Sequence, residues 1–326
     1  MNIVIVGAGT WGTALAKILC CAGNPVTVWS AIASEIEQLN ATRRHKNLPD
    51  MAIPEGIRFT VDLREACAGK ELVFFAVPSV FVRETAKKAA PYMEKGQIIV
   101  DVAKGIEPVT LNTLSQVIRE EIPGVPVVVF SGPTHAEEVA QDLPTTVVSA
   151  CEDWTLAEKV QNVFSDTCMR VYTNTDVLGV EICGALKNII ALACGISAGL
   201  GYGDNTKAAL ITRGLAEMRR LGQAMGCRDE TFAGLAGIGD LIVTATSRHS
   251  RNNQCGFLIG QGCTTEEAIR RVGMVVEGIN ALPAAISLAE KYQVEMPIVE
   301  AVNRIHHGEN PADTVGMLMG RKKKTE

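Results

Sequence analysis

A glycine-rich turn at the end of an N-terminal apolar run constrains the fold of this chain more than any other feature. The segment GAGTWG (residues 7–12) follows IVIV (residues 3–6) directly and opens a helix-forming stretch. Glycine spacing alone is a weak signal, but a strand before it and a helix after it are the context that dinucleotide binding requires. Gly7 would permit the tight turn, Gly9 the close approach of a pyrophosphate, and Gly12 the close packing of helix on strand. The motif therefore predicts an N-terminal dinucleotide-binding unit, against the alternative of an ordinary strand-to-helix turn.

Apolar segments alternate with helix-forming segments through the first half of the 326-residue chain. Continuous apolar runs are typical of strands that are buried on both faces, as in a parallel sheet. We expect such strands at residues 3–6, 26–29, 72–77, 98–100 and 127–130, with residues 145–149 and 169–172 as candidate extensions. Helical patterns lie between them, for example at residues 82–92 and 111–120. The alternation predicts an α/β fold built on a doubly wound Rossmann sheet.

The pattern changes near residue 178, where β-branched runs become scarce and helical patterns take over. We expect helices at residues 180–197, 205–225, 264–271, 278–292 and 298–307. The chain therefore divides into a dinucleotide-binding domain, residues 1–178, and an all-helical C-terminal domain for substrate and catalysis, residues 179–326. Residues 189–203 are uncharged and mostly apolar, but Lys187 and Asn188 precede them and glycine is frequent, so we expect a buried core helix and no membrane span.

Composition narrows the partners and the compartment. The net charge is −5 and no long basic stripe is present, which argues against nucleic acid as a partner. The ten cysteines form no C-x-x-C pair, so we expect no metal site. No secretory signal precedes the first strand, and cysteines without such a signal indicate the reducing cytoplasm. The basic tail, Arg321 to Lys324, is interpreted as a solvated terminus.

Several polar residues lie at positions where ligand-binding or catalytic residues are expected. Lys104 follows one expected strand and Gly132 follows the next, so they could face one anionic ligand at the carboxyl edge of the sheet; the alternative for the lysine is an ordinary surface position. Lys187 lies inside an apolar helix. A buried lysine can exchange protons near neutral pH and serve as a general acid or base, whereas a lysine that reaches solvent would not.

Two further segments suit ligand binding. Asp240 follows a glycine-rich turn and could orient an ammonium or a hydroxyl group, or it could simply cap a helix. The run Ser250-Arg251-Asn252 offers hydroxyl, guanidinium and amide donors. That combination suits a phosphate group, although a solvated loop is the competing interpretation.

Taken together, these segments resemble the bacterial-type NAD(P)-dependent glycerol-3-phosphate dehydrogenases. The resemblance runs in family order from residue 3 to about residue 320. The matching segments are GAGTWGTALA (7–16), VPS (77–79), KGIE (104–107), SGPTHA (131–136), GALKN (184–188), GDN (203–205), ITRGLAEM (211–218), GIGDL (237–241), SRN (250–252), VEG (276–278) and MPI (296–298). The first motif is shared by many dehydrogenases, whereas the series GALKN, ITRGLAEM, GDL and SRN is specific.

The resemblance implies interconversion of dihydroxyacetone phosphate and sn-glycerol 3-phosphate with NAD or NADP, a supply of glycerol 3-phosphate for glycerophospholipid synthesis, and a homodimer. It implies that Lys187 is the catalytic proton donor and acceptor. The substrate-binding positions that it implies are Lys104, Gly132, Thr134, Lys187, Asp240, Ser250, Arg251 and Asn252. The cofactor-binding positions, with the three glycines of the turn, are Gly7, Gly9, Thr10, Trp11, Gly12, Lys104, Ala136, Arg251, Val275 and Glu277. We add that Arg251 should bridge cofactor and substrate, and that Asp240 should orient Lys187.

One departure from the family leaves the choice between NAD and NADP open. Members often carry Arg or His just after the second strand, where this chain has Ala31, and no acidic residue ends that strand. From the sequence alone we expect weak discrimination between the two cofactors. Two other functions remain possible at this stage: a related dehydrogenase for a non-phosphorylated 2- or 3-hydroxy acid, and a non-catalytic NAD(P)-binding sensor or scaffold.

Overall fold

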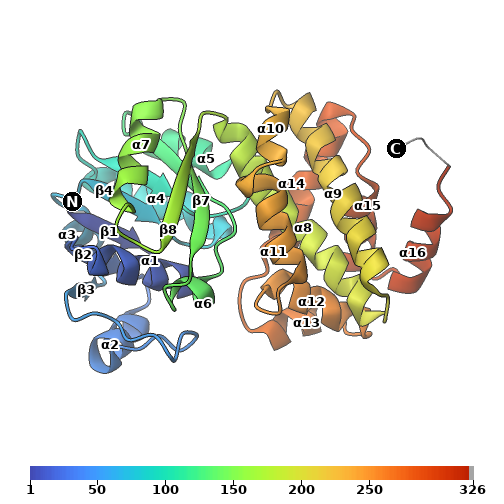
Figure 1. The fold of residues 1–326 in the computed structure, drawn as a ribbon, viewed down its shortest axis with the longest axis horizontal. Helices are drawn as coiled ribbons and strands as arrows, with labels where there is room; N and C mark the ends of the chain where they lie inside the picture. The colour runs from blue at the N-terminus through green and yellow to red at the C-terminus, as the bar shows by residue number, and fades with distance from the viewer. Residues whose placement is uncertain (323–326) are drawn as a thin grey trace. The chain divides into compact units, whose positions relative to one another are not determined.

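The computed structural model describes residues 1–322, which form two compact units (Figure 1). The first unit contains Met1–Lys104 and Asn112–Glu181, and the second contains Gly105–Leu111 and the chain from Ile182 onward. Residue 178, the boundary expected from the sequence, lies at the start of the long helix α8 (Val177–Gly199). Lys323 and Lys324 of the basic tail lie outside the described residues.

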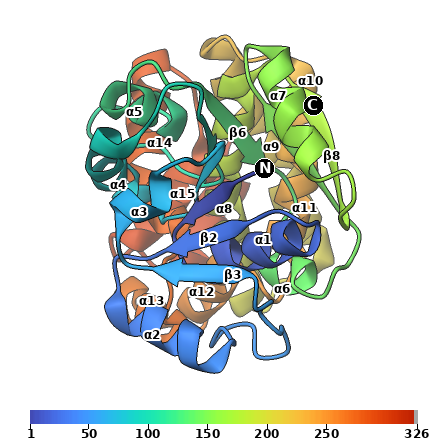
Figure 2. The same cartoon turned by 90° about the vertical axis from the view of Figure 1, so that its left-hand side faces the viewer.

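The first unit is built on one eight-stranded sheet with the order β3-β2-β1-β4-β5-β6-β7-β8. All neighbouring strands are parallel except β6 and β7, which are antiparallel. The strands are β1 (Ile3–Val6), β2 (Val26–Trp29), β3 (Ile57–Thr60), β4 (Leu72–Phe75), β5 (Ile98–Asp101), β6 (Val127–Ser131), β7 (Thr145–Ala150) and β8 (Met169–Asn174). Figure 2 shows β2 and β3 side by side at one edge. The doubly wound sheet is thus confirmed, with β3 as a strand that the sequence analysis did not expect.

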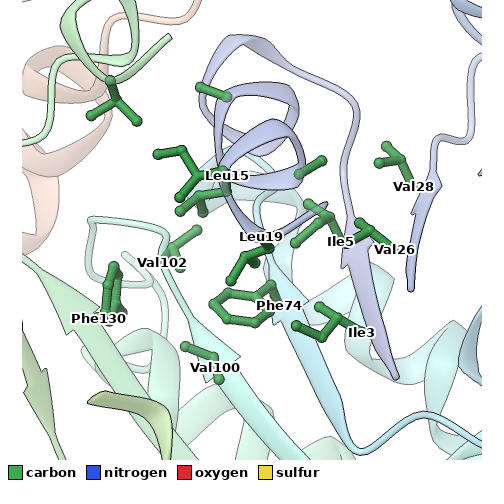
Figure 3. Close-up of a cluster of buried hydrophobic side chains, with 14 of the residues drawn as sticks. Ile3, Ile5, Leu15, Leu19, Val26, Val28, Phe74, Val100, Val102 and Phe130 are labelled. Carbon is green, nitrogen blue, oxygen red and sulfur yellow. The ribbon is translucent and has the colours of Figure 1, made fainter. Parts of the chain in front are cut away.

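Strand β1 shows why the apolar runs form central strands. All four of its residues are buried, and they alternate between two cores. Ile3 and Ile5 belong to one core, where they pack with Leu15 and Leu19 of helix α1 (Thr10–Cys21; Figure 3), and Val4 and Val6 belong to the other. Because successive side chains point to opposite faces, such a strand needs helices on both sides of the sheet.

The helices of the first unit supply that cover. One core takes buried side chains from α1 (Thr10–Cys21), α2 (Ala33–Thr42), α6 (Ala136–Val139) and α7 (Trp154–Val163). The other takes them from α3 (Leu63–Cys67), α4 (Val82–Ala89) and α5 (Leu114–Glu121). Short 3-10 turns at Ser79–Phe81 and Ala90–Tyr92 flank α4. Strands β1 to β6 run in the same direction, so their carboxyl ends share one edge of the sheet, where ligands of such sheets bind.

Apart from the non-helical segment Gly105–Leu111, the described residues of the second unit form helices and the turns between them (Figure 1). After α8 it contains α9 (Asp204–Ala224), α10 (Asp229–Phe232), a π-helical turn (Leu235–Gly239), α11 (Asp240–Thr246), α12 (Arg251–Gly260), α13 (Thr265–Val272), α14 (Glu277–Tyr292), α15 (Pro297–His306) and α16 (Pro311–Met319). Helix α8 is long and apolar enough to cross a membrane, yet 94% of its apolar window is buried within the protein. The prediction of a core helix is therefore confirmed.

Glycines bring α8 and α12 into backbone contact. A Cβ atom on Gly195 of α8 would lie 2.1 Å from the carbonyl oxygen of Asn253, and one on Gly256 of α12 would lie 2.1 Å from that of Leu192. Neither position can take a side chain unless the backbones separate. This close packing sets the start of α12 beside the middle of α8, where Lys187 and Asn188 lie.

Candidate functional site

The glycine turn after β1 has the geometry of an anion-binding helix start. Gly7 has a φ of +124°, and a Cβ there would lie 2.5 Å from the carbonyl oxygen of Ala76, so only glycine fits. A Cβ on Gly12 would lie 2.1 Å from the carbonyl oxygen of Gly7, so helix α1 can approach the strand only without a side chain. A Cβ on Gly9 would meet no atom within 4 Å, so open space lies over the helix N-terminus. The turn fits a pyrophosphate, whose charge the N–H groups of the first helical turn would bind.

A segment between α2 and β3 supports this turn. The side-chain amide of Asn47 donates to the hydroxyl of Thr10 at 3.2 Å, and its backbone N–H donates to Nδ1 of His45 at 3.1 Å. His45 is buried, and desolvation lowers its pKa. It also hydrogen-bonds the backbone of Ala8. No local pattern in the sequence marks His45 and Asn47, because only the sheet order brings this segment back to the first strand.

Three predicted substrate residues meet at the carboxyl ends of β5 and β6. The ammonium of Lys104 donates to the carbonyl oxygen of Gly132 at 2.9 Å and to the hydroxyl of Thr134 at 3.3 Å. Gly132 has a φ of +153°, and a Cβ there would lie 3.1 Å from Cα of Val147, which explains the glycine. Other predicted cofactor residues occupy helix starts in the same unit: Thr10 and Trp11 begin α1, and Ala136 begins α6.

The helical unit holds a buried ion pair. Nζ of Lys187 in α8 lies 2.6 Å from Oδ1 of Asp240 and 2.7 Å from the hydroxyl oxygen of Thr244. The three residues are 5%, 1% and 4% exposed. A carboxylate and a hydroxyl that both accept from one ammonium set its direction as well as balancing its charge.

Local structure explains how Asp240 reaches this position. It is the first residue of α11, directly after the π-helical turn. A Cβ on Gly237 in that turn would lie 2.1 Å from the carbonyl oxygen of Phe232, so the turn requires glycine. A carboxylate in the first turn of a helix is stabilised by the helix dipole. Thr244 lies four residues later, on the same helix face. The spacing of four residues from Asp240 is the sequence signal that could have identified Thr244.

A chain of amides lies along the same part of α8. The Asn252 side chain donates to Oδ1 of Asn188 at 2.9 Å and accepts from the backbone N–H of Gly278 at 2.8 Å. Asn188 in turn donates to the carbonyl oxygen of Gly184 at 3.1 Å. These bonds tie α8, α12 and α14 together. Asn188 lies next to Lys187 in the GALKN segment, but the sequence analysis gave it no role.

The remaining predicted residues gather at the starts of α12 and α14. The hydroxyl of Ser250 caps α12 by accepting from the N–H of Asn253 at 3.2 Å. Arg251 is exposed, and its guanidinium donates to the carbonyl oxygen of Val275 at 3.1 Å. Glu277 is the first residue of α14. The structure thus brings Arg251 and Val275 together and places Ser250 and Asn252 on the same helix start.

A doubly wound sheet with a pyrophosphate-fitting glycine turn, followed by a helical unit with a buried lysine–carboxylate pair, defines a nicotinamide-dependent dehydrogenase. Comparison with known proteins gives the particular family. Residues 2–157 match the model of the NAD-dependent glycerol-3-phosphate dehydrogenase N-terminus, and residues 176–316 match that of its C-terminus. The chain belongs to the NAD-dependent glycerol-3-phosphate dehydrogenase family.

Similar proteins cover the whole chain. The chain is 61% identical to glycerol-3-phosphate dehydrogenase (NAD(P)+) 2 of Lactobacillus delbrueckii subsp. bulgaricus, over 100% of this chain and 98% of that protein. It is 54% identical to glycerol-3-phosphate dehydrogenase (NAD(P)+) of Agathobacter rectalis, over 100% and 97%. The crystal structure of glycerol-3-phosphate dehydrogenase from Coxiella burnetii matches with a TM-score of 0.95 and 38% identity, over 98% of this chain and 99% of that one. The resemblance inferred from the motifs is confirmed.

Proposed function

We propose that this chain is an NAD(P)-dependent oxidoreductase that interconverts dihydroxyacetone phosphate and sn-glycerol 3-phosphate. The observation that carries the proposal is the buried Lys187–Asp240 pair, with Nζ and Oδ1 2.6 Å apart, in a chain of the glycerol-3-phosphate dehydrogenase family. When bound, the nicotinamide supplies a hydride to carbon 2 of the ketone or accepts one from carbon 2 of the alcohol.

Lys187 is the proposed proton donor and acceptor. In reduction the ketone oxygen gains negative charge as carbon 2 is attacked, and the Lys187 ammonium stabilises that charge and transfers a proton to the oxygen. In oxidation the neutral amine takes the hydroxyl proton back. Asp240 and Thr244 hold Nζ in one direction, since both accept hydrogen bonds from it. An ammonium that is already oriented lowers the entropic part of the activation barrier.

The substrate phosphate is assigned to the polar residues at the start of α12. The Arg251 guanidinium suits a phosphate because it can donate two parallel hydrogen bonds, and the helix start adds partial positive charge. Ser250 and Asn252 are the proposed neighbours in that role. Lys104, Gly132 and Thr134 are the proposed substrate contacts of the sheet unit. For the cofactor, we keep the assignment of Gly7, Gly9, Thr10, Trp11, Gly12, Lys104, Ala136, Arg251, Val275 and Glu277.

A homodimer in the cytoplasm that supplies glycerol 3-phosphate for glycerophospholipid synthesis completes the proposal. The ten cysteines are all free, which supports a reducing compartment. The homodimer and the role in lipid synthesis rest on the resemblance to the family. Light scattering coupled to size-exclusion chromatography tests the dimer, which gives twice the 34.8 kDa mass of the chain.

The substrate assignment is tested by comparing a phosphorylated with a non-phosphorylated ketone. We expect the wild-type chain to oxidise reduced nicotinamide rapidly with dihydroxyacetone phosphate and slowly with dihydroxyacetone. Arg251→Ala should lose about tenfold to a hundredfold more in kcat/KM for the phosphorylated than for the non-phosphorylated ketone, because a charge-assisted hydrogen bond contributes about 1.5–3 kcal/mol and the loss of the cofactor contact affects both ketones equally. Arg271→Ala, at an exposed arginine of α13, is the matched control. Equal activity on both ketones would favour a dehydrogenase for non-phosphorylated substrates, and dinucleotide binding without turnover would favour a sensor.

A further inference from the structure

Strand β2 does not end in an acidic residue, but the fold brings the carboxylate of Glu35 to the end of that strand. Ser30 follows β2 directly, and its hydroxyl donates to Oε2 of Glu35 at 2.7 Å. The same hydroxyl accepts from the backbone N–H of Ile32 at 3.2 Å. Ser30 is 5% exposed, and Glu35 is half-buried in the first turn of α2. The chain thus turns back after β2 and holds the Glu35 carboxylate against the end of that strand.

This strand end adjoins the glycine turn. The N–H of Gly7 donates to the carbonyl oxygen of Trp29, the last residue of β2, at 2.8 Å. His45 links the two sides, since it hydrogen-bonds the backbone of Ala8 and lies within electrostatic reach of Glu35. In doubly wound sheets, a dinucleotide whose pyrophosphate occupies the glycine turn brings its adenosine ribose to the end of the second strand. A carboxylate there accepts hydrogen bonds from the ribose hydroxyls.

Three of the four basic side chains in the segment that follows α2 have other partners or are buried, and the fourth, Lys46, is exposed. The guanidinium of Arg43 donates to the carbonyl oxygens of Ile57 and Glu55 and lies over the ring of Phe59. Arg44 donates to the carbonyl oxygen of Pro49 at 2.7 Å. Desolvation by burial lowers the pKa of His45, which favours its uncharged form. Among the described residues, Arg43 and Arg44 thus bond to backbone carbonyl oxygens and His45 to the backbone of Ala8, and none of these bonds involves the Glu35 carboxylate.

The neighbouring strand end is also acidic. The hydroxyl of Thr60, at the end of β3, donates to Oε2 of Glu65 at 3.0 Å. The N–H of Asp62 donates to the same hydroxyl at 3.1 Å. Glu65 also pairs with Arg58. A 2′-phosphate brought to the end of β2 would therefore meet the Glu35 carboxylate, with the Glu65 carboxylate of α3 held at the end of the adjacent strand.

We propose that Ser30 and Glu35 bind the adenosine ribose hydroxyls and make this chain select NAD(H) over NADP(H). The inference rests on the proposed function, since it takes the glycine turn to be the dinucleotide site. The 2′-phosphate of NADP(H) removes one hydroxyl donor and places negative charge beside a carboxylate, and like charges in contact strongly disfavour a ligand. This replaces the weak discrimination expected from Ala31, because the acidic group comes from α2 and not from the strand.

The test measures the dissociation constants of NADH and NADPH for the wild-type chain by isothermal titration calorimetry. We expect NADH to bind at least about tenfold more tightly. Glu35→Gln should narrow the ratio by about tenfold, mostly through tighter NADPH binding, because the amide keeps the size of the side chain and removes its charge. Glu37→Gln, at an exposed acid in the same helix, should leave the ratio unchanged. Far-ultraviolet circular dichroism of each variant confirms that it is folded.

Two results overturn the inference, and they are distinguishable. Equal dissociation constants in the wild type, or a ratio that Glu35→Gln leaves unchanged, would remove the role of Glu35 while the proposed dehydrogenase activity stands. Absence of binding by either dinucleotide to the folded wild-type chain would overturn both the inference and the proposed function.

Discussion

The variant Asp240→Asn tests how much the buried Lys187–Asp240 pair contributes to stability and to catalysis. The substitution leaves the Lys187 ammonium, which is 5% exposed, without the carboxylate that lies 2.6 Å from it. Loss of one partner of a buried ion pair costs about 3–5 kcal/mol of unfolding free energy. We expect a loss of about 3 kcal/mol, near the lower limit, because the Asn carbonyl and the Thr244 hydroxyl can still accept hydrogen bonds.

The assay is urea unfolding followed by circular dichroism, with kcat measured on the same samples. The matched control is Asp229→Asn, which breaks the surface pair between Arg219 and Asp229, where both side chains are nearly half exposed. That pair should contribute less than about 1 kcal/mol. We expect Asp240→Asn to lower kcat by about a hundredfold, since misplacement of a catalytic group by about 1 Å has that effect. An unfolding free energy for Asp240→Asn as close to wild type as that of the control would refute the reasoning.

A double variant separates the effect of an uncompensated buried charge from the effect of packing. Lys187→Met combined with Asp240→Leu replaces the pair by apolar side chains of similar size, which is often neutral or stabilising. The double variant should therefore recover most of the stability that Asp240→Asn loses, while its kcat stays at least as low as that of Lys187→Ala, because the proton-transferring amine is gone. Equal instability of the double variant would mean that packing, and not the uncompensated charge, explains the loss.

Other predictions follow from single positions. Gly9→Ala should fold with near wild-type stability and bind NADH at least about tenfold more weakly, because its Cβ meets no protein atom within 4 Å but occupies the pyrophosphate space. Gly12→Ala should lose stability as well, because its Cβ would lie 2.1 Å from the carbonyl oxygen of Gly7; urea unfolding and NADH titration separate the two variants. Burial raises the pKa of Glu217 to about 7, although its carboxylate accepts from the N–H of Ile298. The native state thus holds a proton that the unfolded state releases from about pH 4.5 upward, so this group makes stability fall as the pH rises to 7 and then level off. Glu217→Gln should remove that decline, and the difference between variant and wild type should grow by about 2–3 kcal/mol between pH 5 and pH 7; a difference that stays constant would contradict the assignment.

The sequence predicted the central strands because each carries its own signal. β1 is buried on both faces, so its apolar run is unbroken. Strand β3 was not predicted because it is a four-residue edge strand whose apolar pattern is interrupted by the exposed Arg58. A short alternating segment of that kind is weakly distinguished from a loop. Only the sheet order, which places β3 next to β2, identifies it as a strand.

The candidate site shows the same contrast between residues with a local sequence signal and residues that only the fold identifies. Lys187 was identified as a candidate because a charged residue inside an apolar helix stands out locally. Its contact with Thr244 was missed because the two residues are 57 positions apart, and one sequence carries no record of such pairings. Glu35 was missed for a different reason. The expected acid was sought at the end of the β2 strand, whereas the chain supplies it five residues after Ser30 from the first turn of α2.

The most direct test of the account is the loss of reduced-nicotinamide absorbance after dihydroxyacetone phosphate is added to the wild-type chain and to Lys187→Ala. The account predicts rapid oxidation by the wild type and a decrease in kcat of about a hundredfold to ten-thousandfold for Lys187→Ala, since proton transfer by a positioned group contributes that much. Lys291→Ala, at an exposed lysine of the helical unit, should keep the wild-type rate. Undiminished turnover by a folded Lys187→Ala variant would contradict the central claim that this amine carries the proton.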